Sequence, residues 1–66
     1  MNVIINGDPQ HLAEGLTIAA LVDQLRLNQR RIAVEVNREI IPRGQYGARA
    51  LADGDQIEIV HFVGGG

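Results

Sequence analysis

The sequence contains no cysteine and no lysine, and each absence removes a class of chemistry. Without cysteine, the chain has no disulfide, no thiolate ligand for a metal, and no side chain that can carry a persulfide or a thioester. Without lysine, it cannot form lysine-linked conjugates with copies of itself. All six basic residues are arginines, and no metal site is predicted.

Aromatic residues, positive charge and long apolar runs are also scarce. Tyr46 and Phe62 are the only aromatic residues, and the formal net charge is -2. A nucleic-acid surface needs a basic stripe or stacking rings, so no nucleic-acid partner is expected. No apolar run approaches the length of a membrane span, and the N-terminus lacks the regions of a signal peptide. We therefore expect a cytoplasmic protein without membrane association.

The first segment of the chain has the composition of a β-hairpin. Residues 1–6 are dominated by β-branched side chains, which favour a strand. Residues 6–9 carry strong turn chemistry, and residues 10–13 are expected to return as a short second strand. Pro9 is placed in the turn, because proline cannot donate a hydrogen bond to a central strand.

Residues 16–25 contain the clearest helical pattern. Their apolar side chains recur at the spacing that places them on one face of a helix: Ile18, Leu21, Val22 and Leu25. Thr17 is the predicted N-cap, with Leu16 and Leu21 in position for a hydrophobic staple. Asn28 is expected to take the left-handed conformation that ends the helix.

Three further strands are predicted after the helix. Residues 31–37 form the first, and a turn at 37–39 leads into a short apolar strand at 40–41. Residues 43–50 contain two glycines and are expected to form a helical turn or a loop. Leu51 is expected to re-enter the core before the last strand.

The last strand begins after the turn signal Asp53-Gly54, and its side chains alternate in character. Ile57 and Ile59 share one face and are expected to lie under the helix. The opposite face is predicted to present an exposed apolar patch, which is typical of a docking surface for a partner protein. That patch consists of Val60, Phe62 and Ile4.

Three glycines follow this strand. Because glycine has wide backbone freedom, Gly64, Gly65 and Gly66 are predicted to form a flexible tail that ends in a free carboxylate. The domain is thus expected to span residues 1–63 and the tail residues 64–66. A tail that leaves directly from a core strand has a defined direction, which favours a function over an inert linker.

The order of elements is strand, strand, helix, strand, short strand, strand. This order is typical of an α+β fold in which one helix crosses a mixed sheet, the β-grasp or ubiquitin-like pattern. A single modest core is all that 66 residues allow, and a pocket that encloses a substrate is not expected.

Several segments carry a resemblance to a known family. They are the helix that opens after Gly15, residues 34–37, residues 40–43 with Tyr46 nearby, residues 51–55, and the final Gly65-Gly66. With the overall length, they make the chain resemble the ThiS-type ubiquitin-like sulfur carriers of thiamine (thiazole) biosynthesis. The chain is also similar to the small subunit of molybdopterin synthase, another β-grasp domain that ends in two glycines.

The resemblance implies a function for the tail. An adenylating (E1-like) enzyme would activate the Gly66 carboxylate with ATP, and a sulfur donor would convert it to a thiocarboxylate. The donor would be a cysteine desulfurase or a rhodanese-type protein, and thiazole synthase would receive the sulfur for the thiazole ring. The chain itself would bind no cofactor and would act as a protein cosubstrate, not as an enzyme.

Three alternatives stay open at this point. A ubiquitin-like protein modifier would use Gly66 through the same adenylate, and so would a carrier of the molybdopterin type. A plain interaction domain would carry an inert tail.

The remaining polar residues are expected to serve the fold or the surface. His11 and His61 are far apart in the sequence, so no acid–base role is assigned to them. Tyr46 and Arg43 are expected to support the folding of their loop. The other charged residues that attract notice are expected to be solvated: Arg30, Arg31, Arg38, Asp55 and Glu58.

Overall fold

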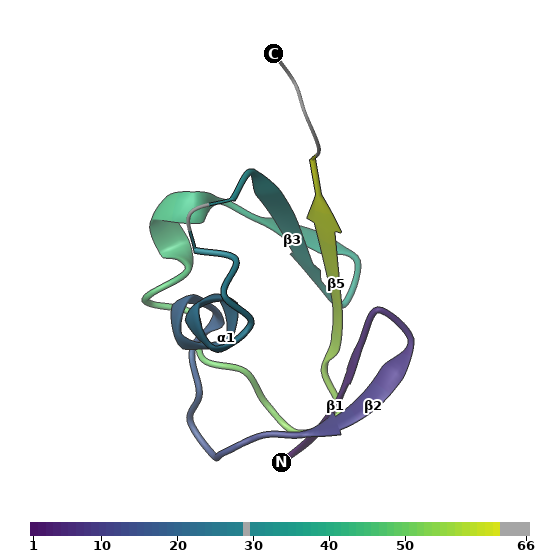
Figure 1. Ribbon diagram of the computed structural model, residues 1–66. Coiled ribbons are helices and arrows are strands. Elements are labelled where there is room, and N and C mark those ends of the chain that lie inside the picture. The colour runs from purple at the N-terminus through teal and green to yellow at the C-terminus, as the bar shows by residue number, and fades with distance from the viewer. Residues whose placement is uncertain (29, 63–66) are drawn as a thin grey trace.

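The computed structural model describes residues 1–28 and 30–62 and shows a mixed sheet with one α-helix against it (Figure 1). The elements in chain order are β1 (Asn2–Ile5), β2 (Asp8–His11), α1 (Ile18–Gln24), β3 (Ile32–Val36), β4 (Glu39–Ile41), a 3₁₀ helix (Arg43–Gln45) and β5 (Gln56–His61). The five strands are ordered β2-β1-β5-β3-β4, and only β1 and β5 run parallel. The predicted α+β, β-grasp fold is confirmed.

The first hairpin is tighter than the sequence predicted. Its turn consists of Asn6 and Gly7 alone, both with positive φ (49° and 83°), the pattern of a two-residue hairpin turn. The prediction that Pro9 lies in the turn is wrong, because Pro9 lies in β2, opposite Ile4. β2 is an edge strand, where a missing N–H group is tolerated.

The helix is capped as predicted, but it is shorter and it ends differently. The hydroxyl of Thr17 accepts a hydrogen bond from the Ala20 N–H at 3.2 Å. Leu16 lies outside the helix, where its carbonyl accepts a hydrogen bond from Leu51 N–H. The prediction that Asn28 ends the helix is wrong, since Arg26 takes the left-handed conformation, with φ at 60°.

The second half of the chain follows the predicted order. Asn37 and Arg38 form the two-residue turn between β3 and β4, again with positive φ (52° and 69°). The expected helical turn within residues 43–50 is the 3₁₀ helix, and Leu51 is buried. Tyr46 is also buried, and its carbonyl accepts a hydrogen bond from Ala19 N–H, so the predicted role in folding this loop is confirmed.

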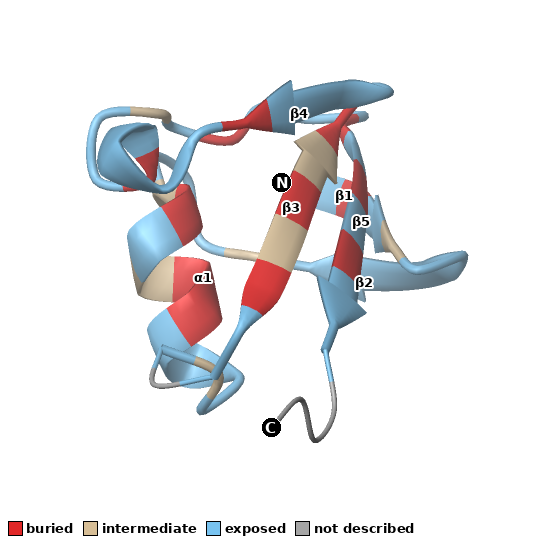
Figure 2. Ribbon diagram, turned by 90° about the horizontal axis from the view of Figure 1, so that it is seen from above, coloured by how far each residue is buried: buried red, intermediate tan, exposed pale blue. Residues whose placement is uncertain are grey.

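The core lies between α1 and the inner face of the sheet (Figure 2). Alternate residues of β3 and β5 are buried, as the period-two pattern predicted. The most completely buried side chains are Ile18, Leu21, Val34, Val36 and Ile57. Ile59 is buried as well, so β5 is fixed to the core along its inner face.

Asp55 was expected to be a solvated surface charge, and this prediction is wrong. It is only 8% exposed, and its two carboxylate oxygens accept hydrogen bonds from Ala52 N–H (2.9 Å) and from the Asn37 side chain (3.0 Å). Asp55 therefore ties the turn before β5 to the turn that joins β3 and β4.

Replacing Asp55 with alanine is expected to lower the free energy of unfolding by about 1–3 kcal/mol, because two part-buried donors lose their acceptor. Urea unfolding measures the loss. Asp53→Ala is the matched control, since Asp53 accepts one exposed hydrogen bond, from Asn2 N–H. It is expected to cost about 1 kcal/mol or less. Equal losses in the two variants would contradict a structural role for Asp55.

Candidate functional site

β5 is the element on which the candidate site is built. It lies in the centre of the sheet, between β1 and β3, and its last residues lead towards the C-terminus (Figure 1). Its register with β1 ends at Ile57, whereas its register with β3 continues to His61. A backbone hydrogen bond from Phe62 N–H to the Arg31 carbonyl (2.8 Å) extends the contact with the β3 side.

The three glycines that are expected to carry the chemistry come shortly after β5 in the sequence. Gly64, Gly65 and Gly66 lie outside the described residues, and so does Val63, the predicted last residue of the domain. The structure does describe the end of β5, which precedes this segment, and the surface around it.

The outer face of the sheet, the face turned away from α1, presents the apolar side chains predicted there. Val60 is 50% exposed, Phe62 56% and Ile4 38%. Val60 lies opposite Ala33. Phe62 follows Val60 by two residues and so points to the same face. Val60 and Phe62 therefore form one patch next to the chain exit, the point after β5 where the C-terminal segment leaves the sheet. Ile4 lies opposite Gln56, at the other end of β5, and Glu58 separates it from Val60. The structure thus brings together two of the three predicted docking residues.

Ile40 is a further exposed apolar residue that the sequence analysis did not single out. It is 71% exposed and lies on β4, opposite Glu35. The sequence could have indicated that Ile40 is exposed, because neighbouring residues of a strand point to opposite faces. With Ile41 buried, Ile40 had to face outwards.

Two carboxylates face each other in the middle of the outer face. Glu35 of β3 and Glu58 of β5 are direct partners in the antiparallel register, so their side chains lie on the same face. Neither forms an ion pair with another of the described residues. Like charges in this position destabilise a sheet.

Glu58→Gln is therefore expected to raise the free energy of unfolding by about 0.2–1 kcal/mol, because it removes the repulsion from Glu35. Urea unfolding at low salt measures the gain. Both groups lie near the surface, so the gain is expected to shrink at high salt, where exposed charges are screened. A loss of stability, or a gain independent of salt, would contradict this interpretation.

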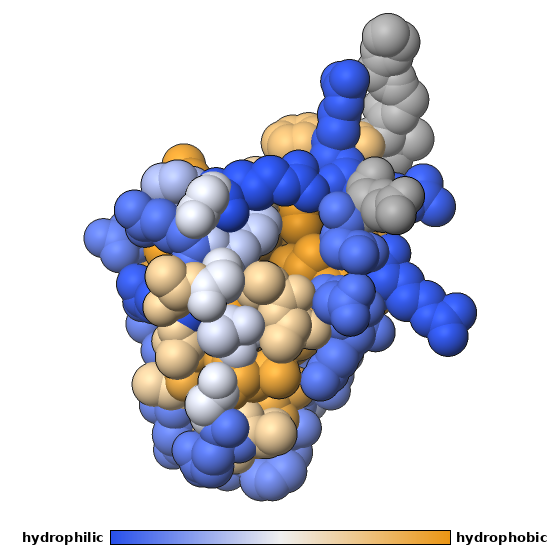
Figure 3. Space-filling view, turned by 90° about the vertical axis from the view of Figure 1, so that its left-hand side faces the viewer, coloured by the Kyte–Doolittle hydropathy of each residue, from blue (hydrophilic) through white to orange (hydrophobic). Residues whose placement is uncertain are grey.

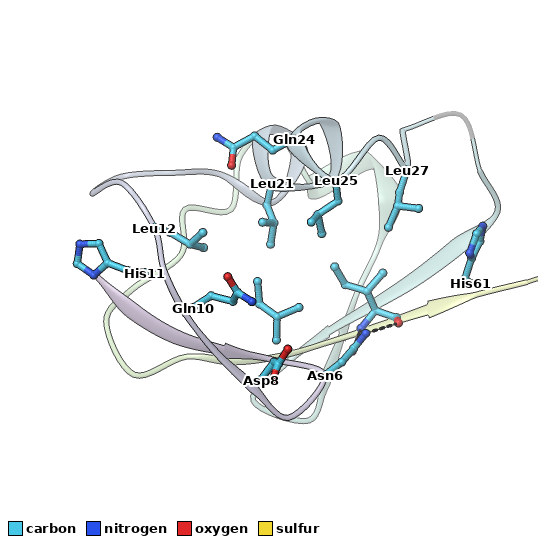
Figure 4. A pocket seen from close by; sticks show the side chains of 12 residues that line it. Asn6, Asp8, Gln10, His11, Leu12, Leu21, Gln24, Leu25, Leu27 and His61 are labelled. Atoms are coloured by element: carbon cyan, nitrogen blue, oxygen red, sulfur yellow. Dashed lines mark hydrogen bonds between the residues drawn. The ribbon is translucent and has the colours of Figure 1, made fainter.

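A cleft of about 600 Å³ lies on the helix side of the sheet, between α1 and the first hairpin. Its walls include Leu21, Leu25 and Leu27, and Figure 3 shows hydrophobic surface gathered on this side of the molecule. His11 and His61 lie at opposite ends of the cleft (Figure 4). They do not form a pair.

Other polar residues named above act within the fold. The guanidinium of Arg43 donates hydrogen bonds to the carbonyls of Asn28 (3.2 Å) and Arg30 (3.4 Å), which holds the 3₁₀ helix against the loop after α1. The predicted support of the loop by Arg43 is confirmed. His11 lies within 2.9 Å of the Asn2 side-chain oxygen, across the first hairpin. Arg31 and Arg38 are exposed.

Residues 1–28 and 30–62 contain no group of three or more histidine and acidic side chains placed to hold a metal ion. The single α-helix in this part of the chain is too short to cross a membrane.

Known proteins resemble this chain in both sequence and fold. The sequence model of the ThiS family matches residues 3–66. A sulfur carrier protein ThiS from Escherichia coli is 33% identical over 66 residues, which are 100% of both chains. The crystal structure of a thiamine biosynthesis protein (ThiS) from Geobacter metallireducens has a TM-score of 0.85 and 36% identity, with 100% of both chains covered.

A larger relative matches the same residues. A thiazole synthase from Paramagnetospirillum magneticum is 42% identical over 66 residues, which are 100% of this chain but only 20% of that protein. The chain thus spans about a fifth of the length of that relative. It is similar over its whole length both to small carriers and to one part of a synthase.

Proposed function

This chain belongs to the ThiS family, and from that premise we propose that it is a sulfur carrier protein of thiamine biosynthesis. The observation that carries the proposal is that the sequence and the fold match the same family. The family match extends through the C-terminal glycines, and the fold matches a solved ThiS structure with a TM-score of 0.85. We place the chemistry on the last of those glycines, Gly66.

In the proposed reaction, the Gly66 carboxylate attacks ATP on a partner enzyme and releases pyrophosphate. A carboxylate is a poor electrophile, whereas the acyl-adenylate has a good leaving group, so a sulfur nucleophile can then attack the carbonyl carbon and release AMP. When the nucleophile is a persulfide, the product is an acyl disulfide, and a second thiol has to cleave its S–S bond, which forms a disulfide on the donor side and releases the thiocarboxylate. The net change on this chain is one carboxylate oxygen replaced by sulfur. The partner enzyme binds and consumes ATP, and this chain is its protein cosubstrate.

Thiazole synthase is the proposed acceptor of the sulfur. The support is the synthase of P. magneticum, in which a domain similar to this chain forms part of the same protein. The proposed sulfur source is a cysteine desulfurase or a rhodanese-type protein, since this chain has no cysteine on which to carry a persulfide. We place these ATP-dependent steps in the cytoplasm.

The proposed docking surface for these partners is the patch of Val60 and Phe62, and Ile4 lies apart from it on the same face of the sheet, beyond Glu58. Ordering a glycine tail costs about 1–2 kcal/mol per residue, so affinity has to come mostly from the folded body. Exposed apolar side chains next to the chain exit are suited to this task, because their burial is favourable and places the tail at the partner's active site.

Exchange of labelled pyrophosphate into ATP tests the adenylation step. With the adenylating enzyme of the same organism, the exchange is expected to depend on the addition of this chain and to saturate with its concentration. An enzyme that is active on another carrier but gives no exchange with this chain would overturn the proposal.

A further inference from the structure

Two asparagines occupy equivalent positions in the two hairpins of the fold. Asn6 follows β1 and Asn37 follows β3, and each is the first residue of a two-residue turn with positive φ (49° and 52°). Each side-chain amide forms two hydrogen bonds, the amide of Asn6 with Ile59 of β5, and that of Asn37 with Gln56 of β5 and with Asp55 just before the strand. The two amides differ in where along β5 they act.

Asn6 acts towards the C-terminal end of the strand. Its Oδ1 accepts a hydrogen bond from Ile59 N–H at 2.8 Å, and its Nδ2 donates to the Ile59 carbonyl at 3.2 Å (Figure 4). Its backbone N–H donates to the Ile57 carbonyl at 2.8 Å. In a parallel ladder the next bond from Ile59 would go to a carbonyl of β1, but β1 has already turned. The Asn6 amide therefore continues the ladder by one step.

Beyond Ile59, the two sides of β5 are supported differently. On one side β3 stays paired with the strand to His61, and the Arg31 carbonyl accepts the Phe62 N–H. On the other side the β1 register has ended, and Ile59 and His61 line the open cleft. Among the described residues, Asn6 is thus the last hydrogen-bonding support of β5 from the β1 side.

Asn37 acts at the beginning of the same strand. Its Oδ1 accepts a hydrogen bond from Gln56 N–H at 3.0 Å, and its Nδ2 donates to Asp55 at 3.0 Å. The two asparagines thus make the same number of side-chain hydrogen bonds from the same kind of turn. Only Asn6 acts close to the chain exit.

We propose that Asn6 is a positioning residue, which fixes the direction in which β5 leaves the sheet and so the place to which Gly66 is delivered. This inference rests on the proposed function. Loss of the amide removes the hydrogen bonds to β5 from the β1 side beyond Ile57, so the end of the strand, still paired with β3 and packed through Ile59, can shift away from the β1 side. Reactive groups must be aligned closely, and a displacement of about 1 Å can cost a hundredfold in rate.

The test compares Asn6→Gly with Asn37→Gly in the pyrophosphate-exchange reaction at varied carrier concentration. Glycine adopts positive φ without strain, so each variant keeps its turn and loses only the side-chain hydrogen bonds. Both variants are expected to unfold at lower temperature. Asn6→Gly is expected to lower kcat by about tenfold or more and to change KM by less than about threefold. Asn37→Gly is expected to change neither beyond about twofold.

Two further measurements keep the proposal testable if Asn6→Gly folds poorly. Asn6→Asp retains the acceptor for Ile59 N–H but places a carboxylate oxygen against the Ile59 carbonyl, so its kcat is expected to lie between those of the wild type and Asn6→Gly. Hydrogen exchange of the Phe62 amide, measured without the enzyme, is expected to be about tenfold faster in the Asn6 variants and unchanged in Asn37→Gly.

Equal kcat values for Asn6→Gly and Asn37→Gly would overturn the positioning role, and so would an effect confined to KM. Either result would leave the proposed function in place, because the wild-type chain would still support exchange. Absence of exchange with the wild-type chain would instead overturn the proposed function.

Discussion

Deletion of Gly65 and Gly66 is expected to reduce pyrophosphate exchange to the background rate. The deletion withdraws the terminal carboxylate by about 7 Å, since each extended residue spans about 3.3–3.6 Å. A carboxylate at that distance cannot reach the α-phosphate of an ATP bound for reaction at Gly66. The exchange rate with saturating carrier measures the effect, which is the largest that the proposed mechanism predicts.

The shortened chain also supplies its own control. The core residues that the structure describes lie between Met1 and Ile59, so the shortened chain is expected to unfold at the same temperature as the full chain. It is further expected to inhibit the wild-type reaction competitively, because docking is assigned to the folded body. Undiminished exchange would show that Gly66 is not the reacting residue. A shortened chain that neither reacts nor competes would contradict docking through the body.

Phe62→Asp is expected to raise KM for the adenylating enzyme by about tenfold to a hundredfold, with a smaller effect on kcat. Full burial of such a side chain contributes about 1.5–3 kcal/mol, and each 1.4 kcal/mol is about tenfold in affinity. Steady-state exchange at varied carrier concentration measures the change. Little effect on folding is expected, since Phe62 is 56% exposed.

Leu25→Asp is the matched control for the docking surface. Leu25 is 43% exposed, close to the value for Phe62, but it follows α1 on the opposite side of the sheet. Its substitution is expected to leave KM within about threefold of the wild-type value. If Leu25→Asp raised KM as much as Phe62→Asp, the docking surface would lie elsewhere.

The parts of the fold that depend on local pattern were predictable from the sequence. Alternation in β5 indicated that Ile57 and Ile59 are buried and that Val60 and Phe62 are exposed, because strand geometry alone determines which residues share a face. Thr17 was identifiable as a cap, because few residue types can accept a hydrogen bond from the first turn of a helix.

The errors arose where another part of the chain decides the outcome. Pro9 has turn chemistry, yet it lies in a strand because that strand is at the edge of the sheet. Asp55 belongs to a residue type that is common in surface turns, yet its carboxylate accepts hydrogen bonds from Asn37 and Ala52. The edge position of β2 and the hydrogen bond between Asn37 and Asp55 appear only once the strands are placed side by side.

The candidate site was also predictable from the sequence only in part. The exposed patch and the glycine segment could be named from the sequence, whereas the facing pair Glu35 and Glu58 depends on the register between β3 and β5. The contact between Asn6 and Ile59 joins residues that are 53 positions apart, so no local pattern could indicate it.

The most direct test of the central claim is the intact mass of the protein after incubation with ATP, the adenylating enzyme and a sulfur source. We predict a gain equal to the replacement of one oxygen by sulfur in the wild-type chain, with no gain in the chain that lacks Gly65 and Gly66. An unchanged wild-type mass, under conditions in which the same enzyme and sulfur source convert another carrier, would contradict the sulfur-carrier function.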